Sequence, residues 1–326
     1  MSDRAPPLEE TALQEVGRAY RRFADNEARG RSSLYEALAR RVAEDGEILR
    51  FLLTLPRIKR QPNLLFAALR LLRGTPVDAD DFRRRLFVDA AEVRDLMLRR
   101  ATQTNEPARC AVLLPALAAL PQPLALLEVG ASAGLCLLPD RYGYDYGASR
   151  LSPERRPCLR CVAGPGTPLP ASLPQIVWRA GLDLNPLAAS DRQDRAWLEA
   201  LVWPEQTDRL ERLGQALAIA SDAGVRIGQG DLRHDLASLA ADVPGDATLV
   251  IFHTAVLAYV TSMEERQAFA RQATELADFW IANEAPFVFP DIASRAPAKG
   301  DGFLLSINGE PTAWTDPHGA SIDWID

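Results

Sequence analysis

The chain has 326 residues, of which 47% are hydrophobic and 25% charged, a globular composition that excludes collagen-like, low-complexity and wholly disordered chains. Its net charge is −7 and it holds only two lysines, which argues against nucleic-acid binding. Four cysteines are too few for a disulfide scaffold, and we find no apolar run that is long enough for a membrane span or a signal peptide. We therefore expect a cytoplasmic protein that binds neither nucleic acid nor membranes; the sequence does not indicate its oligomeric state.

The first third of the chain differs in composition from the rest. Only four of the 20 glycines lie within residues 1–120, and residues 1–115 carry 21 basic and 17 acidic side chains. Apolar residues recur there at helical spacing. The segments with this spacing are 8–29, 32–44, 46–54, 62–73, 79–101 and 105–120. The sequence thus predicts an all-helical cap domain over residues 1–120.

Strands and helices alternate after Pro121. The predicted strands are 124–129, 175–182, 224–227, 248–252 and 279–283, and the predicted helices are 191–221 (interrupted at Pro204), 235–242 and 262–277. Uninterrupted apolar strands between helices predict a parallel sheet that is covered on both faces. Residues 121–326 are therefore expected to form a Rossmann-like α/β domain with an irregular insertion at about 141–174. The dipeptide Asn308-Gly309 predicts a C-terminal antiparallel hairpin.

Polar residues follow each predicted strand of this domain. They are Glu128, Asp183, Asp231, His253 with Thr254, and Glu284. Ligands of open α/β sheets bind beyond the carboxyl ends of the strands, so we expect these side chains to share one edge of the sheet.

The segment Gly130–Gly134 (GASAG) lies directly after the first strand. Gly130 would allow a tight turn, Gly134 would allow close approach of a helix and a ligand, and a following helix would present free N–H groups to an anionic or carboxylate-bearing ligand. Asp183 is predicted to bind two ribose hydroxyls. It lies 53 positions after Gly130, against about 20 in dinucleotide-binding folds, so Asp145 is an alternative ribose ligand.

The same segment also fits the G-x-S-x-G turn that carries the nucleophile of α/β-hydrolases. Ser132, Asp231 and His253 follow the chain order of such a triad. Two features disfavour a serine hydrolase: only helices precede the first strand, and Glu128 stands where an apolar residue would suit a buried turn.

Several long phrases resemble the domain of unknown function 2332 family of bacterial proteins. They are LLEVGASAG, RAGLDLNPL, WLEALVWPEQTDRLERL, LVIFHTAVLAYV, QTNEPARC and the terminal DPHG. The sequence departs from the family at Cys136, where Asn is expected. The family is similar to class I S-adenosylmethionine-dependent methyltransferases, which implies that fold and that cofactor.

The resemblance also implies roles for individual residues. Glu128, Gly130, Ser132 and Gly134 match the first methyltransferase motif, with Ser132 in place of its middle glycine, and would hold the methionine end of the cofactor. Asp183 would bind the ribose and Asp231 would face the adenine. His253 and Thr254 occupy the substrate-facing fourth motif, which here is F-H-T rather than an Asp/Asn-Pro-Pro type.

Methyl transfer needs a base only when the acceptor must lose a proton, and His253 is the best candidate for that base. Asn105, Glu106 and Arg109, together with Thr254 and Glu284, are predicted to contact a small-molecule substrate. Nothing in the sequence requires a metal. The leading hypothesis is a methyltransferase with an unidentified acceptor; the alternatives are a non-catalytic nucleoside-binding module of the same fold and the serine hydrolase.

Overall fold

A computed structural model describes residues 8–298 and 302–325. These residues form two compact units. One contains the described residues up to Thr104 together with Gln193–Glu211, and the other contains Asn105–Arg192 and the described residues from Arg212 onward. Among the described residues, no helix combines the length and apolar character that a membrane crossing requires. The predicted domain boundary at residue 120 stays a prediction.

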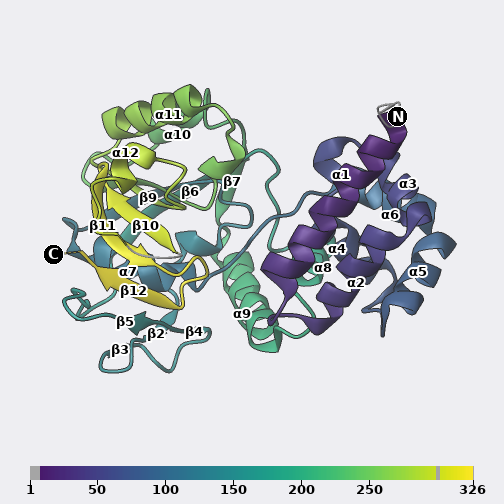
Figure 1. The fold of residues 1–326 in the computed structure, drawn as a ribbon. Helices are drawn as coiled ribbons and strands as arrows, with labels where there is room; N and C mark the ends of the chain where they lie inside the picture. Colours follow the sequence, from purple (N-terminus) through teal and green to yellow (C-terminus); the bar gives the residue numbers. More distant parts are fainter. Residues whose placement is uncertain (1–7, 299–301, 326) are drawn as a thin grey trace. The chain divides into compact units, whose positions relative to one another are not determined.

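Helices build the first unit, whose residues up to 104 are purple to blue in Figure 1 and whose segment 193–211 is teal to green. They are α1 (Leu8–Phe23) with a π-helical turn (Ala24–Ala28), α2 (Ser33–Glu44), α3 (Gly46–Leu53), a 3-10 turn (Arg57–Lys59), α4 (Pro62–Arg73), α5 (Ala79–Val88), α6 (Ala90–Arg99) and α8 (Arg192–Leu201). Helix α9 (Thr207–Ala223) begins in this unit and ends in the other. The core of the first unit is aromatic: the Phe66 ring lies 4.9 Å from that of Tyr35 and 5.6 Å from that of Phe82.

One long helix over 79–101 was expected, and this prediction is wrong. The helix stops at Val88 and a new one starts at Ala90, because Asp89 has a non-helical backbone and its carboxylate accepts a hydrogen bond from Arg73. The distant segment 193–211 joins the unit through buried Trp197, whose indole N–H donates to the Ala101 carbonyl.

A nine-stranded sheet forms the centre of the second unit. Its strands, in spatial order, are β5 (Val162–Ala163), β12 (Ser321–Trp324), β11 (Glu310–Thr315), β10 (Phe303–Ile307), β9 (Phe279–Glu284), β8 (Thr248–Thr254), β1 (Leu124–Val129), β6 (Ile176–Asp183) and β7 (Arg226–Gln229). The five strands from β9 to β7 are parallel, as the apolar runs predict, and β9, β10, β11 and β12 pair antiparallel. The protein is therefore a mixed α/β protein with a mostly parallel central sheet.

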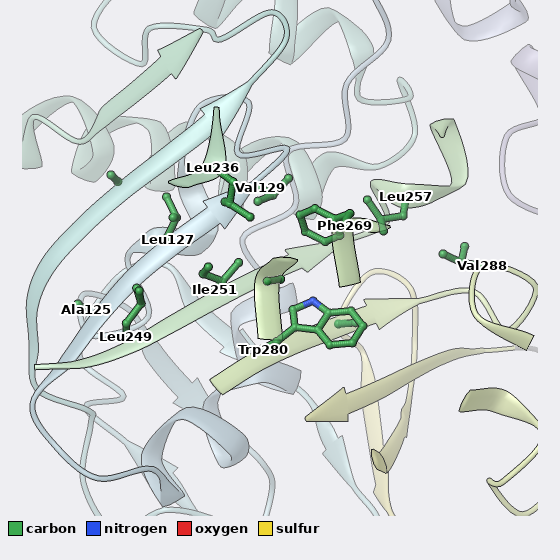
Figure 2. Packing of buried hydrophobic residues seen from close by; sticks show 13 residues of the cluster. Ala125, Leu127, Val129, Leu236, Leu249, Ile251, Leu257, Phe269, Trp280 and Val288 are labelled. Atoms are coloured by element: carbon green, nitrogen blue, oxygen red, sulfur yellow. The ribbon is translucent and has the colours of Figure 1, made fainter. Parts of the chain in front are cut away.

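Alternate residues of β1 face opposite sides of this sheet. Leu127 and Val129 belong to a cluster with Ile251 of β8 and Phe269 of α11 (Met263–Leu276), and Figure 2 shows these side chains together. Helices α10 (Leu236–Ala240) and α12 (Pro290–Ala293) contribute to the same face. Glu128, between Leu127 and Val129, points to the other face.

The predicted C-terminal hairpin is confirmed. Asn308 and Gly309 have φ values of 51° and 78°, the positive values that a type I′ turn needs, and they connect β10 to β11. The Asn308 side chain also accepts a hydrogen bond from the backbone N–H of Trp280, which ties the turn to β9.

The insertion has more regular structure than expected. Strands β2 (Gly143–Asp145), β3 (Arg150–Leu151) and β4 (Cys158–Arg160) form a small separate sheet, and β5 joins the edge of the main one. Three tyrosines of the YGYDYG segment are buried, and each hydroxyl donates to a backbone carbonyl; they are Tyr142, Tyr144 and Tyr146. The segment is thus ordered, and Tyr142 and Tyr146 tie it to Leu135 and to Ala111.

Candidate functional site

The chain reverses its direction of sheet growth at β1. From β1 it adds β6 and β7 on one side, and then crosses over to add β8 and β9 on the other. In open α/β sheets a ligand site lies at such a switch point, beyond the carboxyl ends of the strands. Glu128, Asp183, Thr254 and Glu284 all lie at these ends, in β1, β6, β8 and β9. The predicted gathering at one sheet edge therefore occurs for these four residues.

All backbone N–H groups of the turn after β1 donate hydrogen bonds within the protein. Gly130 and Ala131 donate their N–H groups to the carbonyl of Leu182, at 2.7 and 3.2 Å. Gly134 donates to Ala131 at 2.7 Å. The N–H groups between them bond side chains: Ser132 bonds Asp183 Oδ2 at 2.8 Å, and Ala133 bonds Asn105 Oδ1 at 3.0 Å. Every N–H of Gly130–Gly134 thus has a partner within the protein.

This arrangement corrects one prediction. We expected a helix after the turn, with free N–H groups at its start for an anionic or carboxylate-bearing ligand. Only a single 3-10 turn, Leu135–Leu137, follows before the insertion begins. The N–H groups of Gly130–Gly134 that would cradle a phosphate are already bonded within the protein.

Ser132 has a φ of 51°, in the left-handed region that glycine adopts without strain. Such a conformation costs a serine about 1–2 kcal/mol, so its surroundings must impose it. Asn105 does so with both ends of its amide, because its Nδ2 donates to Ser132 Oγ at 2.6 Å while its Oδ1 holds Ala133. Asp183 holds the Ser132 N–H from the other side.

Asp183 ends β6, the strand next to β1. Its Oδ1 accepts the N–H of Asn185 at 2.7 Å, and its Oδ2 accepts that of Ser132. The alternative ribose ligand, Asp145, lies in β2 of the small sheet and pairs with Arg150 at 3.3 Å. Of the two carboxylates, only Asp183 lies at the carboxyl edge of the main sheet.

Glu128 is the one buried carboxyl of β1. It is 4% exposed, and its Oε2 atom has no hydrogen-bond partner. Burial raises the pKa of this carboxyl well above its usual range, the Cys136 thiol and Asp183 raise it further, and Arg109 opposes the rise. The raised pKa favours the neutral, protonated carboxyl in the folded protein.

The segment Asn105–Arg109 connects loops of the second unit. Besides the contacts of Asn105, Glu106 accepts Arg212 Nε at 2.9 Å, and Arg109 donates to Thr254 Oγ1 at 3.3 Å and to the Pro317 carbonyl at 2.9 Å. These residues were predicted to contact substrate from the helical domain. Their polar contacts fix the turn after β1, the end of β8 and the DPHG turn relative to each other, and their contact with substrate stays a prediction.

His253 is fully buried, and both ring nitrogens are engaged. Its Nδ1 lies 2.8 Å from Glu284 Oε1, and its Nε2 accepts the indole N–H of Trp280 at 3.1 Å. Glu284 Oε1 also accepts the N–H groups of Val256 and Leu257. His253 therefore has no free lone pair with which to take a proton from a substrate.

The hydrolase triad does not assemble. Ser132 Oγ contacts Asn105 instead of a histidine, and His253 is bonded to Glu284 and Trp280. Asp231 pairs with Arg233 at 2.5 Å, and this guanidinium lowers the pKa of Asp231 to about 2.

A family model described as "Uncharacterized protein conserved in bacteria (DUF2332)" matches residues 17–324. The chain belongs to this family. No curated protein sequence matches this DUF2332 chain. The predicted resemblance to that family is confirmed, and it covers both structural units.

The cysteines of this DUF2332 protein are free thiols. Cys158 lies in β4, and burial raises the pKa of Cys161 to about 12. High thiol pKa values disfavour the thiolate that redox chemistry needs. Within the described residues, no three His, Cys, Asp or Glu side chains gather as a metal site would require.

Two side chains of the site were given no functional role from the sequence. Arg212 is the partner of Glu106, and the two lie 106 positions apart, so no local pattern links them. Asn283 is completely buried, with Oδ1 accepting Thr315 Oγ1 at 2.7 Å and Nδ2 without a partner. A polar residue at the end of an apolar strand was the available signal for Asn283.

Proposed function

We propose that this protein binds S-adenosylmethionine and transfers its methyl group to an unidentified small-molecule acceptor. Two features of the fold support the proposal. The spatial order β7-β6-β1-β8-β9 corresponds to the order 3-2-1-4-5 of doubly wound nucleotide-binding sheets. The glycine-containing turn and the acidic Asp183 follow the two strands at the switch point.

The observation that carries the proposal is the electrostatic character of this sheet edge. The turn Gly130–Gly134 offers no free N–H, whereas Glu128 offers an unpartnered carboxyl oxygen. A phosphate-bearing cofactor is poorly matched to such a site. A cationic ligand is well matched, and S-adenosylmethionine carries a sulfonium and an ammonium group.

The residues present suggest how they would divide the work. Glu128 would face the cationic methionine end. Each carboxylate oxygen of Asp183 accepts a backbone N–H, which fixes the carboxylate at the end of β6, where it would bind the ribose. Asp231, which follows β7, would lie toward the adenine. The rigid turn, fixed by Asn105 and Asp183, would supply positioning.

The bound cofactor would supply a methyl group on a neutral leaving group, so the protein needs no acid for that step. Buried His253 is not assigned as a base, because both of its nitrogens are engaged. This observation also favours a second candidate, a binding protein of the same fold that performs no transfer. The protein is incubated with methyl-labelled S-adenosylmethionine and a cell extract that supplies possible acceptors. Transfer of label to a compound of the extract indicates a methyltransferase, and binding without transfer indicates a binding protein.

Thermal unfolding with S-adenosylhomocysteine tests the binding proposal. A ligand at about 100 times its Kd should add about 2.7 kcal/mol to the free energy of unfolding. Asp183→Ala should abolish this gain, while Asp145→Ala, which removes the other candidate ribose carboxylate, should keep it. The absence of any shift at millimolar ligand would refute the proposal, and a full shift in Asp183→Ala would refute the ribose role.

A further inference from the structure

Glu128 is an unusual group for the interior of a sheet. Few of the side chains around it could compensate a negative charge. The ionisable groups that interact with it are Arg109 and Cys110 of α7 (Arg109–Ala119), Cys136 of the 3-10 turn, Tyr142 of the insertion and Asp183 of β6. Only Arg109 is cationic among them.

Arg109 does not neutralise Glu128 directly. Its guanidinium donates to the carbonyls of Thr254 and Pro317 and to the Thr254 hydroxyl, and it forms no ion pair with Glu128. Burial of a carboxylate whose Oε2 atom has no partner is unfavourable, so the folded free protein favours the neutral acid of Glu128. The site therefore needs a cation to ionise this side chain.

We infer that binding of the ligand's ammonium group to Glu128 expels one proton from the protein into the solvent. The inference rests on the proposed function and deepens it. In the exchange, the Glu128 O–H bond breaks, its electron pair stays on the carboxylate, the proton passes to buffer, and the ammonium group takes its place as partner. Charge is conserved, because one cation enters as another leaves.

The exchange makes ligand affinity depend on pH with a defined sign. Below the pKa that Glu128 has in the ligand-free protein, the fraction of ionised Glu128 rises about tenfold with each pH unit. The affinity for the ligand should therefore also rise about tenfold per unit. Above that pKa the rise should level off. Adenosine, which lacks the ammonium group, should bind with a pH-independent affinity.

Calorimetry provides the test. S-adenosylhomocysteine is titrated into the full chain in two buffers of different ionisation enthalpy, and the difference in heat counts the protons exchanged. We expect about one proton released per ligand bound for the wild type and about none for Glu128→Gln. Asp145→Asn is the matched control, because Asp145 lies in the small sheet and the Gly147 N–H and Arg150 lower the pKa of its carboxyl, and it should retain the release.

The outcomes separate the two proposals. If S-adenosylhomocysteine binds without proton release, or if Glu128→Gln still releases a proton, the inference is wrong and the proposed function stands. If neither heat nor a thermal shift appears at any pH, both fail. Should Glu128→Gln not fold, the wild-type comparison of S-adenosylhomocysteine with adenosine decides, because equal pH dependence of the two would refute the role of the ammonium group.

Discussion

Gly130→Ala should destabilise the second unit by about 3 kcal/mol. Two costs combine at this position. Its φ of 71° strains an alanine by about 1–2 kcal/mol. A Cβ atom would also lie 2.3 Å from Val256 Cγ2 and 2.8 Å from its Cγ1, and overpacking of this kind costs about 1–3 kcal/mol. Denaturant unfolding of both proteins measures the difference.

Matched variants separate the two costs. Gly147 has a φ of 80°, but a Cβ there would meet nothing within 4 Å, so Gly147→Ala should show only the backbone cost of about 1–2 kcal/mol. Combining Gly130→Ala with Val256→Ala should recover about 1–2 kcal/mol relative to the sum of the single changes. If Gly130→Ala lowers the free energy of unfolding by no more than Gly147→Ala does, Val256 does not fill the space beside Gly130 as described.

Gly130 shows how far a sequence pattern can lead. A glycine after an apolar strand predicts a tight turn, and the positive φ agrees. The pattern cannot reveal that Val256, on the loop after β8, fills the space beside Gly130. At Gly134 the space left by the missing side chain is also occupied, by Ile227 at 2.8 Å, so the chain itself uses the room that we had expected for a close approach.

The parallel strands were predictable because their signal is local. Strands β1, β8 and β9 are short, largely apolar runs between helical segments, and burial of β1 along its whole length follows directly from LALLEV. The breaks were harder to predict: the helix end at Asp89 depends on Arg73, 16 positions away. The helix expected after Gly134 is replaced because the YGYDYG segment folds back and buries its three tyrosines, which no helical periodicity can express.

The polar contacts of the site were the least predictable part. The sequence shows that polar residues end the strands, and the shared sheet edge follows from topology. It does not show which of them satisfy each other. Asn105 reaches Ser132 and Glu106 reaches Arg212 across 27 and 106 positions, so two residues expected to face substrate are engaged within the fold. His253 likewise finds its partners in β9, the neighbouring strand.

Buried polar atoms without a hydrogen-bond partner therefore indicate a ligand site better than the polarity of a residue alone. Among the described residues of the second unit, three buried side-chain atoms lack partners: Glu128 Oε2, Asn283 Nδ2 and Glu284 Oε2. Glu284 is otherwise well bonded through its Oε1, and Asn283 through its Oδ1. For Glu128 no compensating contact is found. Burial of its carboxyl without a partner lowers the stability of the ligand-free protein, and a bound cation would offset this loss.

Glu128→Gln should accordingly stabilise the ligand-free protein, by about 2 kcal/mol at alkaline pH. The sign follows from linkage. The folded-state pKa of Glu128 lies above the unfolded value of about 4.3, so between the two the folded state holds a proton that the unfolded state lacks. This contribution to stability is fully present below the unfolded pKa and is lost as pH rises through the folded pKa, at up to about 1.4 kcal/mol per pH unit. Glutamine, which does not titrate, removes that decline.

Glu106→Gln is the matched comparison, because it makes the same change at a carboxyl that is equally buried but paired. Glu106 is 1% exposed, and its oxygens accept Arg212 Nε at 2.9 Å and the Ala108 N–H at 3.1 Å. Its substitution should destabilise the protein by about 1–3 kcal/mol, since the Arg212 guanidinium loses its carboxylate. Urea unfolding of both variants between about pH 5 and pH 9 measures the contrast. Opposite signs are expected; if Glu128→Gln destabilises the protein as Glu106→Gln does, Glu128 has a partner that ionises it, and the cation-binding role loses its physical basis.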